Sequence, residues 1–72
     1  MTKTAQRIGR NIAHQRAGRG MTQQELADEA KVTRQYITML EGGKNTPSIP
    51  TIERIAAALD VSVSALLDEE AA

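Results

Sequence analysis

Four residues between positions 34 and 39 have side chains that could recognise nucleic-acid bases. They are Arg34, Gln35, Thr38 and Met39. On an ideal helix with about 100° between residues, they share one arc of about 140°. An arginine can donate two hydrogen bonds to guanine and a glutamine can pair with adenine, while threonine or methionine can touch the thymine methyl group. Every amphipathic helix has a polar outer arc, so the arc alone favours a solvated face and the surrounding sequence must decide.

Residues that could hold phosphate groups flank this arc on both sides. Gln23 opens an expected helix, where free backbone N–H groups are natural partners for a phosphate oxygen. Only residues 31–33 separate that helix from the one that carries the arc, and the small Ala27 lies where the two would cross. A loop with further possible donors follows, at Lys44, Asn45 and Thr46. A helix, a short turn and a second helix in this order favour nucleic-acid recognition over a merely solvated face.

Apolar residues recur at helical spacing throughout the sequence, which predicts an all-α domain with five helices. Serine and threonine residues suited to N-capping open the later helices, and Thr22 with Glu25 has the spacing of a capping box. The expected helices comprise residues 4–17, 23–30 and 34–41, then one between Ser48 and Asp60 and a short one capped by Ser62. Together they predict a single domain over residues 1–72, with a core at about 4–67 and a frayed acidic tail at 68–72.

The composition excludes several kinds of functional site. There is no cysteine for a disulfide or a thiolate zinc site, and one histidine cannot build an imidazole metal site. That residue, His14, lies off the apolar stripe of the first helix, which favours a solvated side chain over a general base. We therefore expect no enzyme activity, cofactor, metal or small-molecule ligand. No apolar run is long enough to span a bilayer, which predicts a soluble, cytoplasmic protein without a membrane partner.

The formal net charge is zero, but the charges are distributed unevenly along the sequence. Residues 1–20 contain five Lys and Arg and no acid, whereas residues 46–72 contain one Arg and five acids. Such asymmetry is compatible with an anionic partner that meets one face only. Two ends of a solvated surface that differ by chance would give the same pattern.

Two segments of the sequence resemble a known family. The segment GMTQQELADEAKVTRQYITMLEGGK, followed by PSIPTIERIAAALDVSVSALL, is similar to the lambda-repressor-like or Xre-type helix-turn-helix domain. The resemblance covers about residues 4–67, nearly the whole chain. It implies a compact five-helix bundle that binds operator DNA, with a helix-turn-helix formed by the second and third helices.

Carried onto matching positions, the resemblance implies a role for each polar residue of this region. It assigns base contacts in the major groove to Arg34, Gln35, Thr38 and Met39. It assigns phosphate contacts to Gln23 and Thr33, and to the loop residues Lys44, Asn45 and Thr46. Tyr36 would reach a phosphate from the groove edge through its hydroxyl group, with a partly buried packing position as the alternative.

The resemblance also implies one structural ion pair, and the sequence departs from the family pattern at two turns. Arg16 and Glu41 match a pair that links the first and third helices in this family, so Arg16 is expected to be structural. Lys31 and Asp60 stand where the family commonly has glycine. A left-handed conformation at Lys31 would be strained, so the turn either adjusts or tolerates the strain.

From the length of the chain we expect no sensor domain, and the resemblance then implies a small stand-alone regulator. Such proteins resemble restriction-modification controllers, phage or plasmid repressors and some antitoxins, and they act as homodimers on palindromic operators. The alternatives are an antitoxin and a protein-interaction bundle without DNA binding. The expected dimer interface comprises Ile49, Val63, Leu66 and Leu67, with an intramolecular core position as the alternative, above all for Val63 and Leu66.

Overall fold

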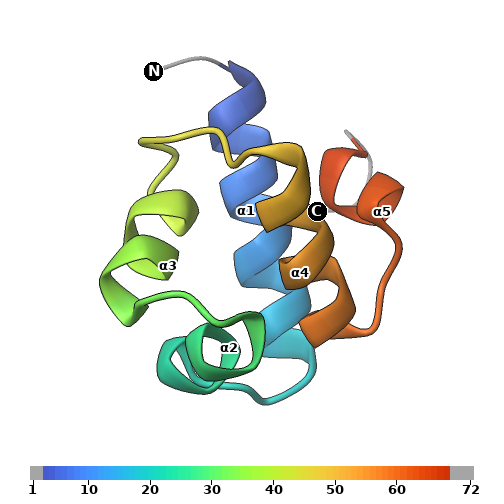
Figure 1. Cartoon of the computed structure of the whole chain (residues 1–72). Coiled ribbons are helices and arrows are strands. Elements are labelled where there is room, and N and C mark those ends of the chain that lie inside the picture. The colour runs from blue at the N-terminus through green and yellow to red at the C-terminus, as the bar shows by residue number, and fades with distance from the viewer. Residues whose placement is uncertain (1–2, 69–72) are drawn as a thin grey trace.

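Five helices account for most of the chain in the structure, a computed structural model that describes residues 3–68. They are α1 (Lys3–Gly18), α2 (Gln23–Ala30), α3 (Arg34–Glu41), α4 (Ile49–Leu59) and α5 (Val63–Leu67) (Figure 1). The described residues contain no strand, so the predicted all-α class is confirmed. Beyond Asp68, the frayed tail expected at 68–72 lies outside the described residues.

Local sequence signals set the beginnings of the helices after α1. The Thr22 hydroxyl accepts a hydrogen bond from the Glu25 N–H, and the Glu25 carboxylate accepts one from the Thr22 N–H. This reciprocal capping box satisfies two amide groups that have no partner inside α2. Hydroxyl groups open the other three helices in the same position: Thr33 for α3, Ser48 for α4 and Ser62 for α5. Each of these caps is a local contact within the chain, so the start of each helix does not depend on packing against another helix.

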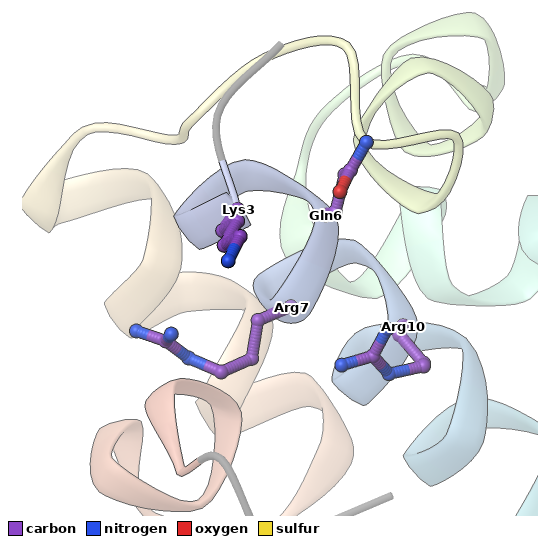
Figure 2. Close-up of a pocket in the computed structure, with 4 residues that line it drawn as sticks. All are labelled: Lys3, Gln6, Arg7 and Arg10. Carbon is purple, nitrogen blue, oxygen red and sulfur yellow. The ribbon is translucent and has the colours of Figure 1, made fainter.

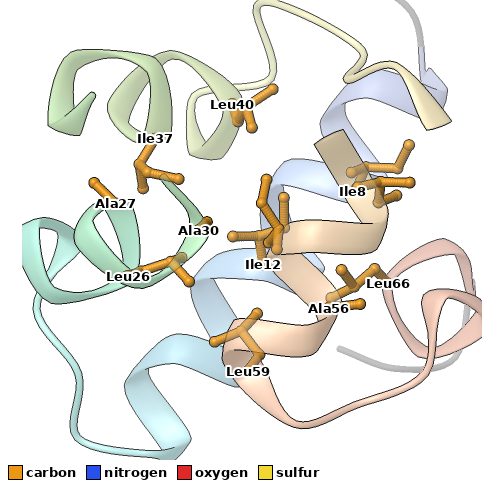
Figure 3. Packing of buried hydrophobic residues seen from close by; sticks show 12 residues of the cluster. Ile8, Ile12, Leu26, Ala27, Ala30, Ile37, Leu40, Ala56, Leu59 and Leu66 are labelled. Atoms are coloured by element: carbon orange, nitrogen blue, oxygen red, sulfur yellow. The ribbon is translucent and has the colours of Figure 1, made fainter. Parts of the chain in front are cut away.

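The core between the helices is entirely aliphatic (Figure 3). Its largest apolar members have no exposed surface and come from all five helices: Ile12, Leu26, Ile37, Leu40, Ile55, Leu59 and Leu66. Burying one such side chain contributes about 1.5–3 kcal/mol. The core therefore holds α3 against α1 and α2 against α4, and its buried members are isoleucine, leucine and alanine.

One glycine allows α3 to lie directly on α1. Gly9 is buried in the middle of α1, and a Cβ atom there would overlap the carbonyl oxygen of Leu40 in α3. The backbones of the two helices thus approach more closely than any side chain would permit. Glycine inside a helix signals a possible close approach, but the sequence does not name the partner.

Two helices end on non-glycine residues in the left-handed conformation. Lys31 has φ 61° after α2, and Asp60 has φ 57° after α4. Both ends have the hydrogen bonds of a Schellman motif, from Val32 N–H to the Ala27 carbonyl and from Val61 N–H to the Ala56 carbonyl. The turn between α2 and α3 therefore keeps its left-handed geometry and tolerates the strain, instead of adjusting to the lysine.

Candidate nucleic-acid interface

Helix α3 places the predicted base-contacting residues on its outer side. Ile37 and Leu40 are completely buried and fix which side of α3 faces the core. On the opposite side Arg34, Gln35 and Thr38 are exposed. Met39 is half-buried, so it lies at the edge of this surface. Three of the four residues of the predicted arc thus lie on an exposed surface of α3, and Met39 is only partly exposed.

Tyr36 occupies the other edge of α3. It is half-buried and packs against the hydrophobic core, while its backbone N–H donates to the Thr33 hydroxyl at 3.1 Å. The Tyr36 side chain therefore occupies the partly buried packing position, which was the alternative interpretation of the sequence.

A bidentate ion pair fixes the end of α3 to α1. Arg16 Nε donates to Glu41 Oε2 at 2.7 Å and Arg16 Nη2 donates to Glu41 Oε1 at 3.0 Å. Arg16 Nη1 also donates to the Met21 carbonyl at 2.8 Å, so the guanidinium group holds the chain before α2 as well. The hydrogen bond to Glu41 raises the pKa of Arg16 above its usual value, and the charge remains at any ordinary pH. The pair implied by the resemblance is present and joins three segments.

Gln23 extends this network to the exposed side of α3. Its Nε2 donates to Glu41 Oε1 at 3.0 Å, and its Oε1 accepts a hydrogen bond from Thr38 Oγ1 at 3.0 Å. The Thr38 hydroxyl also lies 3.1 Å from the Arg34 carbonyl, so its single proton is committed within the protein. Towards a ligand, Thr38 consequently offers its methyl group and its oxygen lone pairs and not a proton. Sequence reasoning missed this network, because it depends on how α2 and α3 cross.

The loop between α3 and α4 carries the remaining predicted phosphate donors. Lys44, Asn45 and Thr46 are exposed, whereas Pro47 is buried beneath them. The Lys44 N–H donates to the Met39 carbonyl at 3.1 Å, which ties the start of the loop to α3. Gly43, with φ 74°, packs against Gln6 of α1, where a Cβ atom would meet the Gln6 side chain at 3.0 Å. The loop therefore leaves α3 along a fixed path.

The four residues expected at a dimer interface differ in their exposure to solvent. Ile49 is 67% exposed and Leu67 is 40% exposed, which are the large apolar side chains most open to solvent in the described chain. Leu66 has no exposed surface, because it fills the core between α1, α4 and α5, and Val63 packs against that core. For Leu66 the intramolecular alternative holds, and a partner could reach only Ile49, Leu67 and the edge of Val63.

Residues 3–68 contain neither a candidate metal site nor a helix that could span a membrane. No group of three or more His, Asp or Glu side chains there could hold a metal ion. Within the same residues, no helix is both long and apolar enough to cross a membrane. His14 is exposed on α1.

Sequence comparison relates the chain to bacterial and phage regulators. The profile of a family described as helix-turn-helix matches residues 12–66. The HTH-type transcriptional regulator SinR of Bacillus subtilis is 42% identical over 64 residues, which are 88% of this chain and 58% of SinR. The immunity repressor protein of Bacillus phage phi105 is 38% identical over 63 residues, 88% of this chain and 44% of the repressor. The chain thus spans about half the length of these curated relatives.

Solved structures agree with this relationship. The clp gene regulator ClgR from C. glutamicum superposes with a TM-score of 0.88 at 29% identity, covering 96% of this chain and 90% of ClgR. The restriction-modification controller protein C.AhdI from Aeromonas hydrophila gives a TM-score of 0.83 at 27% identity, covering 86% of this chain and 94% of the controller. Nearly the whole fold is therefore shared with proteins named as regulators.

Proposed function

Because the chain belongs to the helix-turn-helix family, we propose that it is a sequence-specific DNA-binding regulator of transcription that binds a palindromic operator as a homodimer. The observation that carries the proposal is the exposed side of α3, which a buried face and a hydrogen-bond network hold in one orientation. A prearranged polar surface loses little conformational entropy on binding, so its contacts can serve recognition.

In this proposal α3 lies in the major groove and reads bases. Arg34 and Gln35 are exposed and make no side-chain hydrogen bond among the described residues, so both are available for bidentate contacts with guanine and adenine. Thr38 presents its methyl group or an oxygen lone pair, because its proton is engaged by Gln23 or the Arg34 carbonyl. Half-buried Met39 is limited to an apolar contact at the edge of the helix.

Phosphate contacts would frame α3 and fix its register. The Thr33 hydroxyl accepts from the Tyr36 N–H and keeps its own proton for a phosphate oxygen. Gln23 uses its side chain within the protein, so its phosphate contact is assigned to the backbone N–H groups at the start of α2. Exposed Lys44, Asn45 and Thr46 supply the donors on the other side, and the Tyr36 hydroxyl is assigned to the groove edge.

The homodimer is proposed to form through Ile49 and Leu67, the exposed apolar side chains of α4 and α5. One recognition helix reads only a few base pairs, whereas two helices about 34 Å apart read two half-sites one turn of DNA apart. With a net charge of zero, bulk attraction to DNA is weak. Affinity would therefore depend on specific contacts and on dimerisation.

Selection of bound sequences from random double-stranded DNA tests this proposal. The expected result is a palindromic consensus whose half-sites are about 10 base pairs apart, centre to centre. A consensus of a single half-site would remove the dimer from the proposal. If no sequence is enriched at low salt, sequence-specific DNA binding is refuted and an interaction bundle becomes the better interpretation.

A further inference from the structure

The hydroxyl group of Thr38 on α3 is already engaged by two acceptors of the protein. Its Oγ1 lies 3.0 Å from Gln23 Oε1 and 3.1 Å from the Arg34 carbonyl oxygen. A threonine hydroxyl has one proton and two lone pairs. Whichever of the two acceptors receives the proton, none is left for a DNA base. The proposed function leaves open which base such a side chain would read.

The amide of Gln23 is held in the orientation that makes it an acceptor for Thr38. Its Nε2 donates to Glu41 Oε1 at 3.0 Å. The same carboxylate accepts from Arg16 Nε at 2.7 Å and from Arg16 Nη2 at 3.0 Å, so it serves as an acceptor only. Turning the Gln23 amide over would place its oxygen against a carboxylate oxygen, and two acceptors repel each other. Arg16 and Glu41 thus set the direction of the hydrogen bonds that end at Thr38.

The inner part of this network is shielded from water, whereas its outer end is open. The Glu41 side chain is 9% exposed and the Arg16 side chain is 20% exposed, while Thr38 lies on the exposed side of α3. Shielding strengthens each inner hydrogen bond and makes it costly to leave unmade. The inner contacts are therefore expected to persist when DNA binds. At Thr38 the protein then presents a lone pair and a methyl group.

We propose that Thr38 selects adenine or cytosine, the two bases that carry an amino group in the major groove, over guanine and thymine. Adenine N6 and cytosine N4 are donors, whereas guanine O6 and thymine O4 are acceptors. A lone pair of Thr38 can accept a hydrogen bond from an amino group. Against guanine O6 or thymine O4 it would meet a second acceptor, with no proton between the two oxygens. This preference rests on the proposed function, because it names the class of base that α3 would read.

Contact with the thymine methyl group is the competing use of Thr38. A threonine methyl group can touch that of thymine. On thymine, however, the methyl group and O4 are neighbours, so a threonine side chain that reaches one meets both. Because the Thr38 proton is engaged inside the protein, O4 counts against thymine. Deoxyuridine, which lacks the methyl group, separates the two uses.

Operators that differ only at the base facing Thr38 test the preference. All four bases are placed in turn at each half-site position of the selected palindrome, and fluorescence anisotropy measures binding of the unmodified chain and of Thr38→Val. Valine keeps the shape and a methyl group but has no lone pair. At one position the unmodified chain should bind adenine or cytosine roughly three- to ten-fold more tightly than guanine or thymine, the range of one net hydrogen bond. Thr38→Val should remove this preference and leave the other positions unchanged.

A change of one group in the DNA isolates the contact. Purine deoxyriboside has the ring system of adenine and lacks only the N6 amino group. In the unmodified chain this replacement should lose roughly the same three- to ten-fold, and Thr38→Val should lose much less. The difference between the two proteins measures the coupling of Thr38 with the amino group, because altered base pairing affects both complexes and cancels in the cycle.

Gln23→Leu tests Gln23 as a positioning residue that acts on the base through Thr38. Without Gln23 Oε1 the Thr38 proton is held only by the Arg34 carbonyl and can turn towards a base, so the preference should fall about two-fold or more. Q23L/T38V should lose no more of it than T38V does. The matched control is Gln24→Leu, which removes an exposed amide that bonds Asp28 within α2 and should leave the preference unchanged. A merely structural role of Gln23 would weaken binding to all four bases alike.

A cation on α1 provides the control for overall affinity. Arg10 is exposed and lines a cavity of about 290 Å³ with Lys3, Gln6 and Arg7 (Figure 2). It makes none of the hydrogen bonds that position Thr38. Arg10→Gln removes a positive charge and should change the affinity for every operator by one common factor, because attraction to phosphates does not depend on sequence. The ratios between bases should stay the same.

The outcomes separate the base preference from the proposed function. If guanine or thymine is preferred at the position that Thr38→Val affects, the amino-base preference is overturned, and a thymine preference that deoxyuridine abolishes identifies the methyl contact. If Thr38→Val changes the preference at no position, Thr38 reads no base and the preference is again overturned. Both results leave the sequence-specific regulator intact. If no operator is selected at all, the proposed function is refuted and the base preference with it.

Discussion

Arg34 is the side chain on which base recognition by α3 would depend most. It is the first residue of α3, exposed and without a side-chain hydrogen bond among the described residues, so its planar guanidinium group can meet guanine with two donors. Thr38 differs in kind, because its proton is already used by Gln23 or the Arg34 carbonyl. Two positions one turn apart on α3 thus differ in what they offer to a base, Arg34 through donated protons and Thr38 through a methyl group or a lone pair.

Replacing Arg34 by alanine should cost about 1–3 kcal/mol in binding to the selected operator and much less on unrelated DNA. The reason is that a bidentate base contact disappears, whereas most phosphate contacts remain. Fluorescence anisotropy with both duplexes measures the difference. Arg19→Ala removes an equal charge away from α3 and should leave the ratio of the two affinities unchanged. Equal weakening of Arg34→Ala on both duplexes would exclude base reading at this position.

Glu41 is the acceptor on which the network behind α3 depends. Replacing it by alanine leaves Arg16, which is 20% exposed, without its carboxylate and Gln23 Nε2 without its acceptor. The free energy of unfolding should fall by about 1–3 kcal/mol, since partly buried charged hydrogen bonds are lost. Urea unfolding measures this change. The matched change at exposed Glu53 of α4 should have an effect within about 0.5 kcal/mol. A similar loss at both sites would show that the Glu41 network adds no stability.

At the scale of the helices, the turn between α2 and α3 combines a correct geometry with an unfavourable residue. Lys31 adopts φ 61° because two backbone hydrogen bonds close the end of α2 around it. The left-handed conformation costs a residue with a Cβ atom roughly 1–2 kcal/mol, a cost that glycine avoids. The turn therefore keeps the orientation of α3 relative to α2 despite the backbone strain at Lys31.

Substituting glycine for Lys31 should raise the free energy of unfolding by about 1 kcal/mol, the relieved strain less the entropy that glycine gains in the unfolded chain. Thermal unfolding should show a higher midpoint. Lys31→Ala is the appropriate control, because it removes the same charge without relieving φ and should give no gain. A midpoint that rises equally in both variants would assign the effect to charge instead of to the backbone.

The starts of the helices can be predicted from the sequence, whereas the contacts between helices cannot. Thr22, Thr33 and Ser48 mark helix starts correctly, because each capping bond joins residues only three positions apart in the chain. The roles of Gly9, which lies against the backbone of α3, and of Asn11, whose Nδ2 donates to the Leu66 carbonyl of α5, could not be predicted, because their partners are far away in the sequence. The exposed side of α3 followed from helical periodicity, whereas the engagement of the Thr38 proton required the crossing of two helices.

At the scale of the whole molecule, the exposed apolar side chains are the ones proposed to form the dimer interface. Ile49 opens α4 and Leu67 closes α5, and both are exposed, whereas every other isoleucine and leucine among the described residues is buried. A small all-aliphatic core gives modest stability, so burial of these two side chains against a second copy would contribute to both assembly and folding.

An aspartate at position 49 should therefore weaken dimerisation at least ten-fold and weaken operator binding with it. Burying an unpaired carboxylate in an apolar interface costs more than the 1.4 kcal/mol that a ten-fold change represents. Sedimentation at micromolar concentration measures the dimer, and urea unfolding verifies that the monomer fold persists. Ala57→Glu adds a charge at an exposed position of the same helix and should leave the dimer intact. Dimers that survive Ile49→Asp would place the interface elsewhere.

Tyr36 is the single intrinsic fluorophore of the protein. It is the only residue among tryptophan, tyrosine and phenylalanine in the whole sequence, and it lies half-buried on α3 between the core and the proposed groove edge. Near-ultraviolet emission from the unlabelled protein thus originates from a single place. Its intensity reports on the surroundings of α3, so binding at the proposed DNA surface can be followed without attaching a dye.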